Sequence, residues 1–185
     1  MVCFIQFFVY LCVQKQGNRI PNSNNMKKSQ FISDYVIYDD EKELSPLDAE
    51  LMRQAHEAVA NSYAPYSHFH VGAALRLANG VILKGCNIEN AAYPSGLCAE
   101  RVALFAAQAQ YPDVPIEAIA ITAHSESKMI NEPIPPCGGC RQVMVEAEQR
   151  SKCPMHILCQ GQTGPVFAFD GIETLMPFIF LTKFL

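Results

Sequence analysis

The chain has 185 residues, 50% of them hydrophobic and 17% charged, and its formal net charge is −4 at pH 7. This length suits one domain with its own core and is short for two. The negative charge and the lack of a dense Lys/Arg cluster argue against a nucleic-acid partner, because proteins that follow phosphates present basic surfaces. The eight cysteines do not indicate a disulfide framework, since the sequence has no convincing secretory signal. We therefore expect a cytoplasmic protein whose thiols are free or bind metal.

The first 25 residues differ in character from the rest. Residues 2–13, VCFIQFFVYLCV, are apolar except for Gln6. The run is shorter than the roughly 20 residues that cross a bilayer, and it lacks the basic start and the cleavage site of a signal peptide. We interpret residues 1–25 as a non-native or disordered extension before a natural start at Met26, with residues 26–185 as a single domain and no membrane contact. The alternative is a functional anchor.

The elements follow in chain order. Residues 35–38 suit a short edge strand or packed coil. Ser45 can cap a helix that Pro46 begins, and apolar residues recur at helical spacing to residue 62. Residues 71–77 and 81–86 flank an Asn-Gly turn and should pair as antiparallel strands.

The second half of the chain alternates helices with strands. We expect buried helices over 97–110 and 138–150, a central strand over 116–123, and later strands over 155–160 and 166–169. This order predicts a mixed β-sheet with helices on both faces, which is a three-layer α/β/α fold.

Two short segments carry residues of metal chemistry. Cys98 stands at the start of the first of these helices, and Cys137 and Cys140 stand at the start of the second. Helix N-termini favour thiolates, the form of cysteine that binds zinc. We expect the three sulfurs to meet where the two helix ends converge and to hold Zn²⁺. Three protein ligands leave the fourth tetrahedral position to water, as in catalytic zinc sites.

Glu100 lies two residues after Cys98 and is not a ligand itself. Zinc lowers the pKa of bound water to about 7, and the resulting nucleophile still needs a group that moves its proton. Glu100 is placed for that task. A metal ligand followed two residues later by Glu, and then Pro-Cys-x-x-Cys, resembles the signature of zinc deaminases.

The resemblance extends over roughly residues 46–180 and is specific to the small homotetrameric cytidine deaminases. Four segments carry it in the same order: Tyr66-Ser67-His68-Phe69-His70-Val71-Gly72-Ala73-Ala74, Gly85-Cys86-Asn87-Ile88-Glu89-Asn90-Ala91-Ala92-Tyr93, Cys98-Ala99-Glu100-Arg101 and Pro136-Cys137-Gly138-Gly139-Cys140-Arg141-Gln142. Related deaminases of nucleic acids or of deoxycytidylate usually have His where Cys98 stands. The resemblance therefore implies hydrolysis of cytidine, and of deoxycytidine, to the uridine and ammonia, in pyrimidine salvage.

The resemblance also implies roles for single residues. Arg101 and Arg141 would hydrogen-bond the zinc thiolates and so offset their charge. Six residues would bind substrate or close a pocket, in part across subunits: Asn87 and Glu89 on the ribose, Phe69 on the base, the Ala99 N–H on the pyrimidine carbonyl, and Tyr93 and Phe180 at contacts with a neighbouring subunit.

Other interpretations remain open at this point. The Cys137–Cys140 pair could be a redox dithiol, and Cys86 could complete a closed structural zinc site without catalysis. Asn87 and Glu89 could be turn residues only. The substrate could also be another aminated ring. The remaining histidines and cysteines suit structural roles: His56, His68, His70, His124, Cys153 and Cys159.

Overall fold

The computed structural model describes residues 27–185, and Ile32–Leu185 form one compact unit. The predicted extension, residues 1–25, lies outside the described residues. None of the helices within 27–185 is long and apolar enough to cross a membrane.

A six-stranded mixed sheet forms the centre of this unit, in the order β1-β6-β5-β4-β2-β3. β4 and β5 are parallel, and the other neighbouring strands are antiparallel. The strands are β1 Val36–Tyr38, β2 Phe69–Leu77, β3 Ile82–Cys86, β4 Ile116–Ser125, β5 His156–Gln160 and β6 Val166–Asp170. The hairpin at Asn79-Gly80 and the central position of β4 are confirmed, and of the two alternatives for residues 35–38 the structure shows the edge strand.

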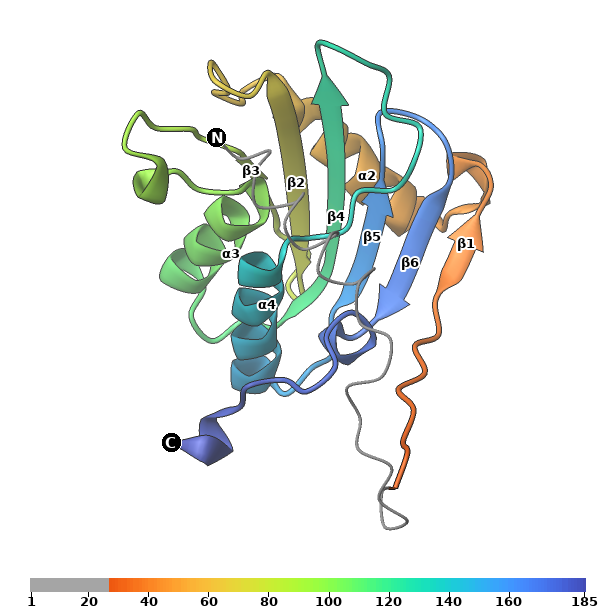
Figure 1. Ribbon diagram of the computed structural model, residues 1–185, viewed down its shortest axis with the longest axis vertical. Helices are drawn as coiled ribbons and strands as arrows, with labels where there is room; N and C mark the ends of the chain where they lie inside the picture. Colours follow the sequence, from red (N-terminus) through yellow and green to blue (C-terminus); the bar gives the residue numbers. More distant parts are fainter. Residues whose placement is uncertain (1–26) are drawn as a thin grey trace. The chain divides into compact units, whose positions relative to one another are not determined.

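Helices cover both faces of the sheet (Figure 1). α3 (Ala99–Gln110) and α4 (Gly138–Ser151) lie side by side on one face, and α2 (Pro46–Val59) lies on the other. Each face has its own buried apolar cluster between helix and sheet. The cluster on the face of α3 and α4 includes Ala73, Leu75 and Leu104, and the cluster on the face of α2 includes Leu51, Met52 and Ala74. The predicted three-layer α/β/α fold is confirmed.

α2 begins as the sequence predicts and ends earlier. The Ser45 hydroxyl accepts a hydrogen bond from the Asp48 N–H at 3.2 Å, and Pro46 is the first helical residue. The helix ends at Val59 and not at residue 62, because the chain turns there to lie beside the end of β3. The Tyr63 N–H donates to the Asn87 carbonyl, and the Ser62 hydroxyl donates to the Val59 carbonyl.

Candidate active site and metal centre

The three predicted zinc ligands all stand at helix N-termini. Cys98 is the N-cap of α3, Cys137 is the N-cap of α4, and Cys140 lies in the first turn of α4. Neither N-cap side chain caps a backbone N–H of its own helix. The unpaired N–H groups and the dipoles of both helices stabilise negative charge here.

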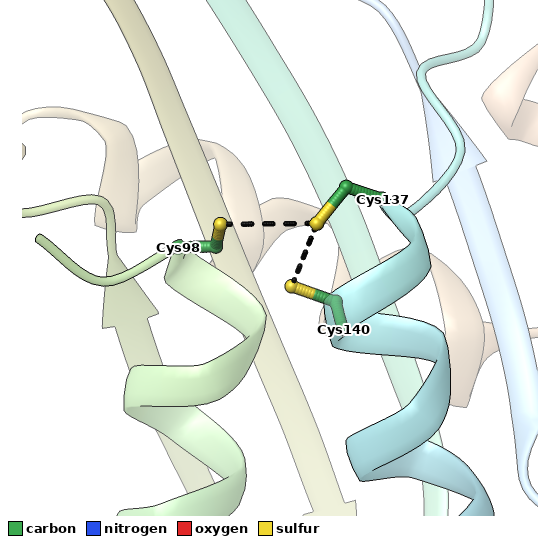
Figure 2. A group of neighbouring side chains, drawn as sticks. All are labelled: Cys98, Cys137 and Cys140. Carbon is green, nitrogen blue, oxygen red and sulfur yellow. Dashed lines mark hydrogen bonds between the residues drawn. The ribbon is translucent and has the colours of Figure 1, made fainter. Parts of the chain in front are cut away.

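The sulfur atoms of these cysteines form a compact group (Figure 2). Sγ of Cys137 lies 4.0 Å from Sγ of Cys98 and 3.5 Å from Sγ of Cys140, and all three lie within 4.8 Å of one another. A disulfide would need a distance of about 2.0 Å. Sulfurs bound to one tetrahedral zinc at about 2.3 Å lie about 3.8 Å apart. The donor type and the spacing therefore both fit a single zinc ion.

Cys86 is not part of this group. Its thiol donates to the Asn61 carbonyl at 3.2 Å, and within residues 27–185 the group that could hold a metal consists of Cys98, Cys137 and Cys140. The closed four-cysteine site that needs Cys86 is therefore wrong. The 3.5 Å separation within the Cys137–Cys140 pair likewise shows free thiols and no disulfide. A site with three protein ligands keeps a position for a small molecule, which is the arrangement of catalytic zinc.

The electrostatics of the group favour thiolate at Cys98. Its pKa is lowered to about 5, first because the Cys140 thiol hydrogen-bonds to it and then because the Arg101 guanidinium lies beside it. Arg101 donates from Nη2 to Sγ of Cys98 at 3.5 Å, as expected from the sequence. The pKa of Cys140 is raised by its bond to Cys98, by burial and by the charge of Glu100. A cation bound here would displace the remaining thiol protons.

Glu100 is a buried carboxyl in the first turn of α3, only 4% exposed. Burial is the main reason that the pKa of Glu100 is raised, and the charge of Cys98 also raises it. Hydrogen bonds from its own backbone N–H and from Cys140 lower the pKa in part. A carboxyl that is buried and still in contact with the sulfur group can both take up and release a proton. The structure thus brings Glu100 together with Cys98 and Cys140 of the sulfur group.

The predicted sugar-binding residues lie near the start of β2. The Asn87 Oδ1 accepts from the Val71 N–H at 2.7 Å, and its Nδ2 donates to the Phe69 carbonyl at 2.9 Å. The Tyr66 and Ser67 N–H groups donate to Oε2 of Glu89 at 2.9 and 3.2 Å. Asn87 and Glu89 therefore fix the Tyr66–Val71 segment, a structural role that goes beyond that of the turn residues that the sequence also allowed.

These contacts leave capacity for a ligand on both side chains. An amide has two N–H donors and two acceptor lone pairs, and Asn87 uses one of each on β2. Both of the backbone hydrogen bonds to the Glu89 carboxylate end on Oε2. Burial opposes ionisation of Glu89, but the Ser67 hydroxyl and the two backbone N–H groups hold its pKa below the usual value. Glu89 is thus an anion, and neither backbone N–H occupies its Oε1.

Phe69 lies on the same side of the sheet as the sulfurs. Side chains alternate along a strand, and Val71, Ala73 and Leu75 belong to the core beneath α3 and α4. Phe69 shares that face and is half-buried. Ala99 is the first residue of α3, where N–H groups have no partner within the helix.

The two aromatic residues expected at subunit contacts are exposed. Tyr93 is 65% exposed and Phe180 is 55% exposed. Tyr93 contacts Tyr66 edge-on with ring centroids 6.0 Å apart, and Phe180 stacks on Phe184 at 6.0 Å. Within the single chain, neither residue is brought to the sulfur group by these contacts.

Arg141 differs from the expectation. Its Nε donates to the Pro136 carbonyl at 2.8 Å and its Nη1 donates to the Leu175 carbonyl at 2.5 Å. In the structure the guanidinium is thus engaged by carbonyl groups and not by the thiolates. It ties the residue before Cys137 to the C-terminal segment.

Sequence reasoning missed Gly85, which sets the position of α3. A Cβ at this residue would lie 2.3 Å from the Ala99 carbonyl oxygen and 2.7 Å from the Ala103 nitrogen. Only glycine lets the first turn of α3, with Cys98 and Glu100, pack this closely on β3. The available signal was a glycine inside a strand pattern, which often marks a close approach of another backbone.

Comparisons with known proteins agree with this geometry. Residues 45–156 match the family described as the cytidine and deoxycytidylate deaminase zinc-binding region. The chain is 46% identical over 96 residues to the cytidine deaminase of Halalkalibacterium halodurans. The aligned region covers 52% of this chain and 68% of that protein. The crystal structure of cytidine deaminase from Burkholderia pseudomallei is similar with a TM-score of 0.62 and 39% identity, covering 71% of this chain and 97% of that one. The Mycobacterium tuberculosis cytidine deaminase structure matches with a TM-score of 0.55 and 30% identity, covering 71% and 95%.

Proposed function

We propose that this chain, which belongs to the family of cytidine and deoxycytidylate deaminases, is a zinc-dependent enzyme that hydrolyses cytidine to uridine and ammonia. One observation carries the proposal: three cysteine sulfurs at two helix N-termini are spaced for one zinc ion, with the buried Glu100 carboxyl beside them. Relatives named as cytidine deaminases support the choice of substrate.

Cys98, Cys137 and Cys140 would hold the zinc ion. The chemistry that zinc supplies in such a site is Lewis acidity, which lowers the pKa of water and makes a nucleophile available at neutral pH. Arg101 offsets part of the negative charge of the cluster through its bond to Sγ of Cys98.

Glu100 moves the protons of the reaction. Its carboxylate would take one proton from the attacking water and deliver it to ring N3. It would then take the second proton from the C4 hydroxyl of the addition product and deliver it to the amine, so that the C4 carbonyl forms as ammonia leaves. Burial raises its pKa, and a carboxyl whose pKa is closer to neutral exchanges protons more effectively in both directions. The net reaction consumes one water and releases one ammonia for each cytidine.

The start of β2 and the first turn of α3 would orient the nucleoside. The Ala99 N–H donates to the pyrimidine carbonyl, and the ring of Phe69 packs on the base. Oε1 of Glu89 accepts from a ribose hydroxyl, and the second N–H of Asn87 donates to the sugar. We extend the proposal to deoxycytidine and to a place in pyrimidine salvage, in the cytoplasm, where free thiols stay reduced.

We also propose a homotetramer, in which Tyr93 and Phe180 meet neighbouring subunits. Exposed aromatic side chains support it, since a large apolar surface on a monomer marks an interaction site. Phe178 is 98% exposed and lies two residues before Phe180, and Phe105 on α3 is 44% exposed. Sedimentation analysis tests the assembly: a species of four chains is expected, and a monomer at micromolar concentration would contradict it.

Direct measurement of ammonia release tests the function. The zinc-loaded protein is offered cytidine, deoxycytidine, cytosine, adenosine and deoxycytidylate at equal concentration, with the Glu100→Ala protein as the blank. We expect release from cytidine and deoxycytidine and none from free cytosine, which lacks the sugar that Glu89 binds. Release from adenosine alone would instead support a deaminase of another aminated ring.

A further inference from the structure

A carboxylate and two imidazoles meet at the start of β2. Glu126 follows β4 directly, and its Oε2 lies 3.1 Å from Nδ1 of His68. Its Oε1 lies 3.2 Å from Nε2 of His70. The backbone N–H of Glu126 also donates to the His68 carbonyl at 3.2 Å. Glu126 therefore holds this segment through three of its own atoms.

The segment that Glu126 holds has an uncommon backbone conformation. His68 adopts a left-handed conformation with φ of 53°. A residue with a Cβ keeps such a conformation only where its surroundings determine it, and such positions gather at functional sites. Two sets of contacts fix this conformation: the hydrogen bond from the His68 N–H to the Ala64 carbonyl at 3.0 Å, and the contacts of His68 with Glu126.

The residues on both sides of His68 are connected to the proposed substrate-binding residues. Ser67 donates its N–H to Oε2 of Glu89, and its hydroxyl accepts from the Phe69 N–H at 3.1 Å. The Phe69 carbonyl accepts from Asn87. A rotation of the backbone at His68 would therefore move the bond to Glu89 and the ring of Phe69 together.

His70 anchors the same segment on the opposite face of the sheet. Its Nδ1 lies 2.6 Å from the Ser62 hydroxyl, which is bonded to the end of α2 at the Val59 carbonyl. His124, opposite His70 in the register of β2 and β4, lies beside it with ring centroids 6.2 Å apart. Glu126 thus links the substrate segment to α2 as well as to β4.

We propose that Glu126 is a positioning residue for the nucleoside site. By holding His68 and His70, it fixes the left-handed conformation of His68. That conformation places the Phe69 ring against the base and the Ser67 N–H within hydrogen-bond distance of Glu89. The inference rests on the proposed function for the identity of the ligand. In the proposed site Glu126 touches neither substrate nor metal ligands, so its removal changes binding of the nucleoside and leaves the proton-transfer groups in place.

The expected effect is moderate, because the Glu126 side chain is 56% exposed and exposed ion pairs contribute little. The backbone bond from Glu126 to His68 also survives a side-chain substitution. We expect Glu126→Ala to raise KM for cytidine about threefold to tenfold, which corresponds to about 0.7–1.4 kcal/mol. Glu126→Gln keeps one acceptor oxygen and should give a smaller rise.

The experiment compares Glu126→Ala, Glu126→Gln and wild type, with Glu146→Ala on the exposed surface of α4 as the matched control. Steady-state kinetics with cytidine give kcat and KM, calorimetry gives the Kd of uridine, and zinc is measured per chain. We expect KM and the uridine Kd to rise together in the Ala variant, with kcat, zinc content and Glu146→Ala unchanged.

Two results would overturn the inference: an unchanged uridine Kd in Glu126→Ala, or a fall in kcat and zinc content equal to the rise in KM, which would show a general structural role. Wild-type protein that binds uridine but releases no ammonia from cytidine would contradict the proposed function alone, since the uridine Kd still tests Glu126.

Discussion

Replacement of Gly85 by alanine tests how the fold positions the metal centre. The added Cβ would lie 2.3 Å from the Ala99 carbonyl oxygen and 2.7 Å from the Ala103 nitrogen, both on the backbone of α3. Backbone atoms cannot rotate away, so α3 must move out by about 1 Å to restore an ordinary contact. Such overpacking costs about 1–3 kcal/mol, which lowers Tm by about 2–12 °C in a domain of this size.

The displacement acts on the zinc site because α3 carries Cys98 as its N-cap. A shift of about 1 Å is large against the tolerance of about 0.2 Å on zinc–ligand distances. We therefore expect Gly85→Ala to weaken zinc binding as well as folding. Thermal unfolding and zinc per folded chain, measured in competition with a chelator, check both effects.

Gly72→Ala is the matched control. Its Cβ would lie 2.1 Å from the Ala55 carbonyl oxygen on α2, which covers the opposite face and carries no zinc ligand. We expect a comparable loss of stability with zinc affinity of the folded fraction retained. Equal loss of zinc in both variants, or no loss in Gly85→Ala, would refute the reasoning that close packing on β3 places the ligand.

Two further variants separate chemistry from recognition. Glu100→Gln should lower kcat for cytidine by a factor of about 10²–10⁴, because an amide cannot carry the proton, while zinc content stays at the wild-type level. Substantial turnover of this variant in single-turnover assays would show that Glu100 is not the proton carrier. Glu89→Gln should mainly raise KM for cytidine, by about tenfold or more, because a charged acceptor for a ribose hydroxyl is lost. If wild type used free cytosine as readily as cytidine, that result would count against a sugar-binding role of Glu89.

Local sequence signals determined most of the fold. Ser45-Pro46 placed the start of α2, and Asn79-Gly80 placed the β2–β3 turn, since capping and turn geometry depend on neighbouring residues only. The metal centre was also foreseeable, because Cys98 and the Cys137–Cys140 pair each stand at the start of a helix. The identity of the substrate depended on resemblance to a family.

The features that were missed depend on contacts between distant residues. Arg141 donates to the Leu175 carbonyl, which lies 34 residues further along the chain, and the sequence around Arg141 does not indicate that partner. Gly85 meets α3, and Glu126 meets His68, only after β2, β3 and β4 have paired. A spacing rule cannot supply such contacts, because they follow from the packing of complete layers.

The most direct test of the zinc site is X-ray absorption at the zinc edge of the protein as isolated, with zinc counted per chain. We expect one zinc bound by three sulfurs at about 2.3 Å and one lighter atom at about 2.0 Å, with the sulfur count reduced in Cys98→Ala. Four sulfurs around the metal, or a spectrum that does not change in Cys98→Ala, would contradict it.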